Sequence, residues 1–383
     1  MALPPVYGHA RARATLAAAA RAGTLTQSLL VHGPAGVGKE RFAHWVAALV
    51  LCAEPGAEGP CGRCRDCRTV ERLEHPDVHW FFPLPRPDAA SPEKLREKLE
   101  EARGAELAAR RADPHHLPQF DKAPAYFLGT VLNLQRLAAL RPSVGSRKVF
   151  VVGDAEAMVP QESSQEAANA FLKLLEEPPA DTTLVLTSSS PGALLPTIRS
   201  RVLPIRLLKL ADDEVAAFLE RELAMAPAEA ASLATAADGA IGRALRLRPG
   251  AGGEGALQKQ RDAGRALLAA ALAEGEAPRL AAAGGVGPSG ARGEFTGSLD
   301  ALALWLRDLM ATAAGAPETV RYAAADADLL RRLAARPGMA PEGVARAIVR
   351  VREAQALAAG NVNPQLVLAA LLRGIRLELG GAP

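Results

Sequence analysis

A glycine-rich segment with a lysine offers phosphate chemistry near the start of the chain. Residues 28–40 read Ser-Leu-Leu-Val-His-Gly-Pro-Ala-Gly-Val-Gly-Lys-Glu, which predicts a buried strand, a turn and the start of a helix. Gly33, Gly38 and Lys39 have the spacing of a P-loop, in which backbone N–H groups wrap a phosphate and the lysine reaches the outer phosphates. Gly33, Gly36, Gly38 and Lys39 are therefore candidates to bind the phosphates of ATP or ADP.

Acidic residues decide whether this site hydrolyses ATP. Glu40 stands where a P-loop has the Ser or Thr whose hydroxyl binds Mg²⁺. Asp154 follows the apolar run 148–153 and has the place of a Walker B aspartate that orders Mg²⁺; a helix cap or turn is an equally good interpretation. The glutamate that orients water in active enzymes is replaced by Ala155, and Glu156 should face the other side of the strand. We expect nucleotide binding to remain possible and efficient hydrolysis to be absent.

The cysteines point to a metal. All four lie in the pattern Cys52-x8-Cys61-x2-Cys64-x2-Cys67. Thiolates two residues apart can bind one ion from a tight turn, and four of them complete a tetrahedral shell with no open position for water. We therefore predict a structural Zn²⁺ site, with free or partly buried cysteines as the alternative.

A further candidate is Arg201, which follows Ser200 in the segment 194–202, Leu-Leu-Pro-Thr-Ile-Arg-Ser-Arg-Val. From spacing alone, a structural role at the rim of a sheet is the simpler interpretation. The alternative is an arginine presented in trans to the nucleotide of a neighbouring subunit, where it stabilises the transferred negative charge.

Strands alternating with helices must position these residues. Such alternation around a P-loop predicts a parallel α/β sheet, whose ligands bind at the carboxyl ends of the strands. The P-loop, Asp154 and residues 187–189 all fall at that edge. The predicted strands are residues 28–32, 76–82, 148–154, 182–187 and 202–207.

The rest of the chain predicts helices and an insertion. Residues 83–124 are charged and rich in proline, and predict an insertion that decorates the core with one exposed helix at 91–111. After Leu208 only helical patterns remain. These comprise helices at 211–225 and 228–247, a glycine-rich joint at 250–255, and an all-helical region at 258–379 interrupted by a loop at 284–297.

Composition sets broad limits. The 383 residues suggest two or three domains. A net charge of +3, from 45 basic and 42 acidic residues, argues neither for nor against a nucleic-acid partner. The sequence shows no secretory signal and no apolar run long enough to cross a bilayer. We expect a soluble cytoplasmic protein.

Taken together, these motifs resemble the bacterial DNA polymerase III clamp-loader subunits of the AAA+ class, most closely the delta-prime members. The P-loop and the cysteine module that follows its helix are similar to those of the family, although Val202 replaces the cysteine of its Ser-Arg-Cys motif. The other similar segments are 75–77 (His-Pro-Asp), 169–179 (Asn-Ala-Phe-Leu-Lys-Leu-Leu-Glu-Glu-Pro-Pro), 198–202 (Ile-Arg-Ser-Arg-Val) and 361–366 (Asn-Val-Asn-Pro-Gln-Leu).

The resemblance implies a protein of three domains. They are an AAA+ P-loop domain at 1–207, with the zinc module at 52–67 and the insertion at 83–124, a small helical lid domain at 208–250, and a helical collar domain for oligomerisation at 255–383. It also implies a ring with gamma/tau and delta subunits that loads the sliding clamp on primed DNA, as part of the DNA-directed DNA polymerase III holoenzyme.

Departures from the family pattern distinguish its members. The gamma/tau motor would have Thr or Ser at position 40, Glu at position 155 and a sensor-2 arginine where Gly242 stands, one residue before Arg243. The three losses favour a delta-prime subunit without hydrolysis, whose Arg201 completes the ATP site of a neighbour. The alternatives are a gamma/tau-like motor that tolerates Glu40, and a zinc-stabilised interaction protein outside replication.

Overall fold

The computed structural model of the chain describes residues 2–118, 120, 122, 124–158, 166–248, 256–287, 292–358 and 362–380. It contains two compact units, Met1–Arg246 and Leu247–Pro383. The first unit holds the predicted P-loop domain together with most of the predicted lid, so the boundary between these two stays a prediction. The predicted glycine-rich joint at 250–255 lies outside the described residues.

A five-stranded parallel sheet forms the centre of the first unit. Its order is β2-β3-β4-β1-β5, so β4 separates the P-loop strand β1 from the Asp154 strand β3. The predicted fold class is confirmed, and each strand lies within two residues of its predicted bounds. The strands are β1 (Ser28–His32), β2 (Val78–Phe81), β3 (Lys148–Val152), β4 (Thr182–Ser188) and β5 (Leu203–Arg206).

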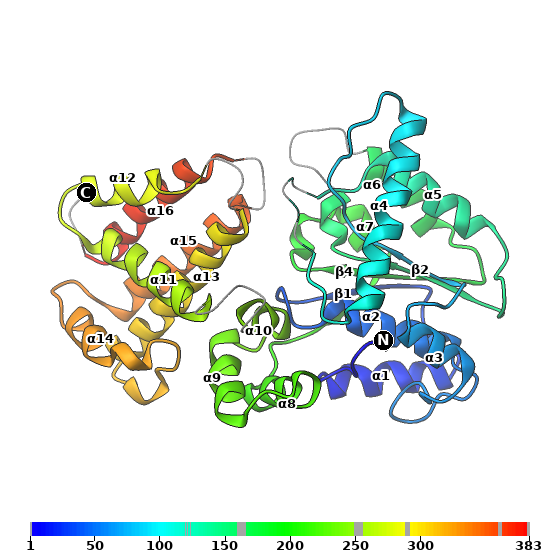
Figure 1. Cartoon of the computed structure of the whole chain (residues 1–383), viewed down its shortest axis with the longest axis horizontal. Helices are drawn as coiled ribbons and strands as arrows, with labels where there is room; N and C mark the ends of the chain where they lie inside the picture. The colour runs from blue at the N-terminus through cyan, green and yellow to red at the C-terminus, as the bar shows by residue number, and fades with distance from the viewer. Residues whose placement is uncertain are drawn as a thin grey trace. The chain divides into compact units, whose positions relative to one another are not determined.

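Helices cover both faces of this sheet (Figure 1). Alternate strand residues point to opposite faces: Leu29 and Val31 of β1 enter one buried cluster, and Leu30 enters the other. Both faces must therefore be covered, which is why the strands read as continuous apolar runs. The first cluster includes α1 (Ala10–Arg21), α2 (Lys39–Leu51) and α3 (Arg65–Glu71), and the second includes α5 (Leu128–Ala139), α6 (Glu166–Glu176) and α7 (Pro196–Arg199).

The insertion contains one long helix, α4 (Pro92–Ala112), close to the predicted 91–111. The prediction that it merely decorates the core is wrong at two positions, since Leu99 and Arg110 are only 2% and 7% exposed. Leu99 joins the buried cluster on the α2 side, which also contains Trp80 and Phe82. The helix therefore completes the cover of that face.

The last part of the first unit is helical, as predicted. It contains α8 (Asp212–Leu223), α9 (Pro227–Ala237) and α10 (Ile241–Leu247). The single helix predicted over 228–247 is interrupted because Asp238 and Gly239 adopt positive φ angles of 52° and 76°, which end a right-handed helix.

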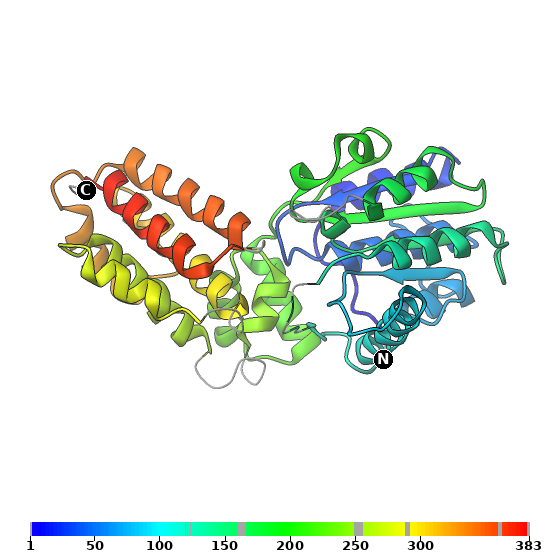
Figure 2. The ribbon, with the colours of Figure 1, turned by 90° about the horizontal axis from the view of Figure 1, so that it is seen from above.

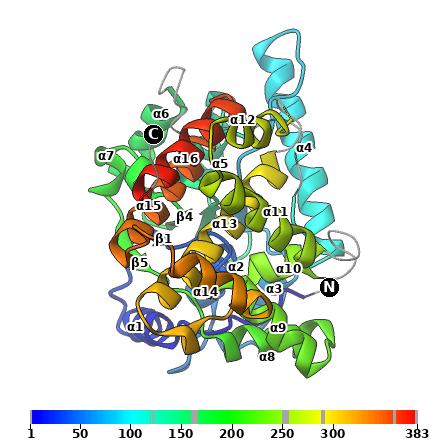
Figure 3. The same ribbon diagram turned by 90° about the vertical axis from the view of Figure 1, so that its left-hand side faces the viewer.

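The second unit consists of helices only, coloured from yellow to red in Figure 2. Helix α12 lies beside α16, as Figures 1 and 3 both show. The predicted loop at 284–297 is too long, because α13 already begins at Arg292. A Cβ on Gly264 of α11 would lie 2.8 Å from the backbone carbonyl carbon of Ala301 in α13, so this glycine permits close packing of the two helices. The helices are α11 (Ala256–Leu272), α12 (Ala277–Gly284), α13 (Arg292–Ala313), α14 (Ala327–Ala334), α15 (Pro341–Ala358) and α16 (Pro364–Glu378).

Within the described residues, none of the helices combines the length and the apolar character needed to span a bilayer.

Candidate functional site

The P-loop joins the end of β1 to the start of α2. Gly33, Gly36 and Gly38 have φ angles of 157°, 80° and 91°, a region that side chains disfavour. At Gly33 there is also no room, because a Cβ would lie 2.3 Å from the carbonyl oxygen of Leu207. The three glycines are thus required by backbone conformation as well as by any phosphate ligand.

Lys39 begins α2 and is only 6% exposed. Its Nζ donates hydrogen bonds to the carbonyl oxygen of Pro34 at 2.9 Å and to Oγ of Ser189 at 2.8 Å. Burial lowers the pKa of this ammonium group. Ser189 follows β4, so the lysine is held between the ends of the two central strands, where a phosphate would have to compete with these partners.

Glu40 and Asp154 crowd the end of β3. Oε1 of Glu40 lies so close that a Cβ on Gly153 would be 2.6 Å from it. Asp154 faces the adjoining cavity, yet the surrounding protein atoms raise its pKa to about 7, with further contributions from the carboxylates of Glu40 and Glu156. The space in which a P-loop enzyme holds Mg²⁺ and phosphates therefore contains two carboxyl groups in this chain, beside the cations of Lys39 and Arg110.

Glu156 also belongs to this cluster, contrary to the prediction that it faces away. The chain does not continue as a strand after Asp154 but forms a short 3₁₀ helix, Ala155–Met158, so strand alternation does not apply. Oε1 of Glu156 accepts hydrogen bonds from the backbone N–H groups of Ser189 at 2.8 Å and Ser190 at 3.2 Å. Glu156 thereby fixes the loop after β4 that carries the partner of Lys39.

The acidic cluster predicts a pH-dependent stability. The pKa of Asp154 rises from 3.8 to about 7 on folding, so the folded chain binds the extra proton between these values and loses stability as pH rises through this window. Asp154→Asn should raise the unfolding temperature by about 2–4 °C near pH 8, because it removes a charge only partly screened by solvent in the cavity. Thermal unfolding followed by circular dichroism should show a smaller gain near pH 5, where the folded carboxyl group is still protonated and the unfolded one is not, and an equal gain at both pH values would contradict the assignment.

Lys39, Glu40 and Asp154 line a cavity of about 480 Å³ within the first unit. Its wall comes from the N-terminal segment, the P-loop, the end of β2, the insertion, α8 and α10. Residues that contribute to the wall include Tyr7, Gly36, Lys39, Glu40, Trp80, Phe82, Arg110, His115, Asp154, Phe218 and Gly242. The cavity is of the size used by small-molecule ligands.

Gly242, where the sequence comparison with gamma/tau would expect an arginine, touches the P-loop directly. Its backbone N–H donates a hydrogen bond to the carbonyl oxygen of Gly36 at 2.8 Å. A Cβ on Gly242 would lie 2.9 Å from Cα of Gly36. A side chain at this position would push α10 away from the P-loop, so glycine permits the close approach of these two segments.

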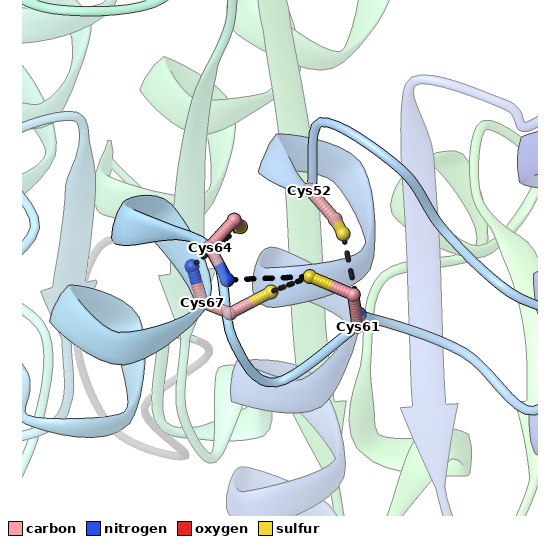
Figure 4. Close-up of side chains that lie close together, drawn as sticks. All are labelled: Cys52, Cys61, Cys64 and Cys67. Atoms are coloured by element: carbon pink, nitrogen blue, oxygen red, sulfur yellow. Dashed lines mark hydrogen bonds between the residues drawn. The ribbon is translucent and has the colours of Figure 1, made fainter.

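The four cysteines come together at the end of α2 (Figure 4). Their sulfur atoms all lie within 4.8 Å of one another, and those of Cys61 and Cys67 are 4.0 Å apart. A tetrahedral zinc with bonds of ~2.3 Å places its sulfur ligands ~3.8 Å apart, so the cluster fits this ion.

Backbone groups prepare the cluster for thiolates. The N–H groups of residues 61, 64 and 67 donate to the sulfur atoms of Cys52, Cys61 and Cys64 at 3.2–3.4 Å. Hydrogen bonds from the backbone of Arg63 and Cys64 lower the pKa of the Cys61 thiol to about 6. Burial raises the pKa of the Cys52 and Cys67 thiols when no ion is bound. A thiolate is the form that binds a metal, and a closed set of four would give such an ion a structural role.

Comparison with known proteins agrees with this architecture. The sequence profile described as "DNA polymerase III, delta subunit" matches residues 8–211. The chain belongs to this DNA polymerase III delta-subunit family. The matched segment contains the whole sheet, the P-loop, the cysteines and Arg201, and the predicted resemblance to delta-prime clamp-loader subunits is confirmed.

Three curated relatives show how far the likeness of this delta-family chain extends. The DNA polymerase III subunit delta' of Pseudomonas aeruginosa is 36% identical over 173 residues, which cover 45% of this chain and 40% of the relative. The subunit delta' of Escherichia coli is 27% identical over 235 residues, covering 61% and 58%. The subunit tau of Salmonella typhimurium is 29% identical over 247 residues, covering 63% and 32%. The matches thus span between about one third and three fifths of each relative.

In this delta-family chain, Arg201 lies just after α7 and is exposed. Its Nη2 donates to Oε1 of Glu176 at 2.8 Å, and its Nη1 donates to the carbonyl oxygen of Thr197 at 2.9 Å. Among the described residues lining the cavity, Arg201 is absent. The guanidinium is therefore held on the surface, separate from the chain's own P-loop.

Sequence reasoning missed the part of the site built by the insertion of this delta-family chain. Arg110, Trp80 and Phe82 line the cavity, yet only the aromatic residues fell in a predicted strand. The sequence feature that could have indicated this is the pair of large aromatic residues, Trp80 and Phe82, at the end of β2. Large aromatic side chains are usually buried, so a further segment of the chain had to pack over them.

Proposed function

We propose that this chain is a delta-prime-like subunit of the DNA polymerase III clamp loader that does not hydrolyse ATP. In this role it joins gamma/tau and delta subunits, supplies Arg201 to the ATP site of a neighbouring subunit, and helps the assembled complex load the sliding clamp on primed DNA. Family membership supports the general role, and the finer assignment rests on the two sites described above.

The observation that carries the proposal is the position of Glu40. A P-loop enzyme needs a neutral hydroxyl there to bind Mg²⁺, but this carboxylate lies over Gly153 and raises the pKa of Asp154. Phosphates would meet repulsion from these acidic groups, and Ala155 supplies no group to orient water. Arg201, by contrast, is exposed and carries the fork of donors suited to a phosphate.

Two cofactors follow from this proposal. Zn²⁺ bound by Cys52, Cys61, Cys64 and Cys67 stabilises the segment after α2. ATP or ADP bound by Gly33, Gly36, Gly38 and Lys39, with Asp154 nearby, remains compatible with the cavity, although binding does not imply hydrolysis.

The proposal predicts no turnover by the chain alone. The purified chain should hydrolyse Mg²⁺–ATP no faster than buffer without protein. A mixture of gamma/tau and delta subunits with clamp and primed DNA should hydrolyse ATP faster when this chain is added. A coupled assay of phosphate release with and without the chain measures both rates. Failure to co-purify with these subunits would contradict the proposed assembly.

A gamma/tau-like motor is the second candidate, because Lys39, Asp154 and a cavity of nucleotide size are retained. It predicts Mg²⁺-dependent turnover by the isolated chain, lost in Lys39→Ala. A zero rate in the same assay would exclude it.

A further inference from the structure

The insertion, residues 83–124, leaves the sheet and returns to it at neighbouring points. It leaves the end of β2 and returns before α5, where Leu84 and Ala125 exchange two backbone hydrogen bonds of 3.1 and 2.9 Å. Its helix α4 is capped by Ser91, whose Oγ accepts from the N–H of Lys94, and is anchored by Leu99 in the buried cluster. The base of the insertion and the N-terminal half of α4 are therefore held in a defined place.

The C-terminal end of α4 contacts the P-loop helix through Arg110. The guanidinium carbon lies 4.2 Å from the ring centroid of Trp80 and 4.1 Å from that of Phe82. Nε of Arg110 donates to Oε1 of Glu106 at 2.8 Å, and Nη1 lies 3.6 Å from Oε2 of Glu40. A buried cation of the insertion thus forms an ion pair with the carboxylate that replaced the P-loop hydroxyl.

The residues just after α4 contact α8. Glu106 also pairs with Nε2 of His116 at 3.2 Å, which ties the following segment to the helix end. The ring of His115 meets the ring of Phe218 edge-on, with centroids 5.6 Å apart. Phe218 is 2% exposed and also packs on Tyr7, whose Oη donates to Oε1 of Glu222 at 2.7 Å. The insertion therefore reaches Glu40 at one point and α8 at another.

A ligand that filled the cavity would link the same two regions, since the P-loop, α8 and α10 all line it. Here the regions are already linked without a ligand by the insertion, by the bond between Gly242 and Gly36 and by the N-terminal segment, in which Tyr7 packs on Phe218 and His9 bonds to Val37. We propose that residues 106–116 form a strap that fastens α8 to the P-loop helix, so that the lid keeps one position whether or not nucleotide is bound. This rests on the proposed function, which it deepens by explaining how a subunit without hydrolysis keeps a fixed geometry.

Hydrogen exchange of the full-length chain tests the strap. In the wild type, exchange of the α8 amides should be the same with and without about 1 mM Mg²⁺–ATP. Arg110→Ala and His115→Ala should each speed exchange in α8 by about tenfold, because local opening no longer has to break the strap. Lys94→Ala is the matched control. It removes a charge from the same helix, where the exposed Lys94 side chain pairs with Glu97 and with no other residue among those the structure describes, and it should leave α8 unchanged.

Two results would overturn the strap. One is unchanged exchange in α8 in both His115→Ala and Arg110→Ala, and the other is a wild type whose α8 amides become tenfold more protected when Mg²⁺–ATP is added. His115→Ala keeps the test valid if Arg110→Ala destabilises the whole sheet, which faster exchange in β3 would reveal. The measurement uses the isolated chain, so failure of the strap is distinct from failure of Arg201 to act in trans, which only the assembled complex can show.

Discussion

Replacing Arg201 by alanine should lower ATP hydrolysis by the assembled clamp loader by about 10³-fold, the lower end of the range for an arginine supplied to a transferred phosphate. The guanidinium is exposed, and its interactions with Glu176 and Thr197 are of a kind that a phosphate can displace. The rate to be measured is hydrolysis stimulated by clamp and primed DNA, with assembly checked by gel filtration. Arg201→Lys should recover little, because an ammonium group lacks the planar fork of donors.

Arg199→Ala is the control for this experiment. Arg199 lies two residues earlier, is exposed and carries the same charge, so its loss tests whether general charge near α7 matters. Two results would contradict the proposed role of Arg201 in trans. One is a normal rate of ATP hydrolysis in Arg201→Ala, and the other is an equal fall of that rate in Arg199→Ala.

Removing the proposed zinc site should strongly destabilise the segment that follows α2. The double variant Cys64→Ser and Cys67→Ser leaves two thiolates and should lose the ion, whose binding free energy in small Cys and His sites is ~10 kcal/mol or more. The cysteine segment packs on α2, since a Cβ on Gly59 would lie 2.4 Å from Cζ2 of Trp45. We therefore expect less than ~0.1 zinc per chain, trypsin cleavage after Arg63 or Arg65, and a red shift of tryptophan fluorescence as Trp45 meets water.

Arg63→Ala should retain about one zinc per chain, because Arg63 forms only an exposed pair with Glu54 in the same turn. Mass spectrometry under native conditions measures the metal content of both variants. A double cysteine variant that keeps its zinc would show that other residues hold the ion.

Much of the fold could be predicted because its signals are local. The strand β3 is a continuous apolar run, and α4 begins with Ser91 and Pro92, a cap and a first-turn proline. The long loop predicted over 284–297 was wrong because Gly297 lies inside α13, and composition alone does not distinguish a glycine within a helix from one in a loop.

The chemistry of the site was predictable only where residues are close in sequence. The P-loop and the cysteine pattern are short motifs, and the structure places their residues together. Glu156 was misplaced because the chain leaves strand geometry directly after Asp154. The pairing of Arg110 with Glu40 joins residues seventy positions apart, which no local pattern encodes.

The register of the central strand has a consequence for synthesis of the chain. Strand β1 pairs with β4 on one side, Ser28 opposite Leu184, and with β5 on the other, Leu29 opposite Leu203. Translation at ~5–20 residues per second leaves β1 without either neighbour for roughly 8–30 s. The strand that leads into the P-loop is thus made first and paired last. During that interval its apolar residues are available to chaperones, and to other nascent chains.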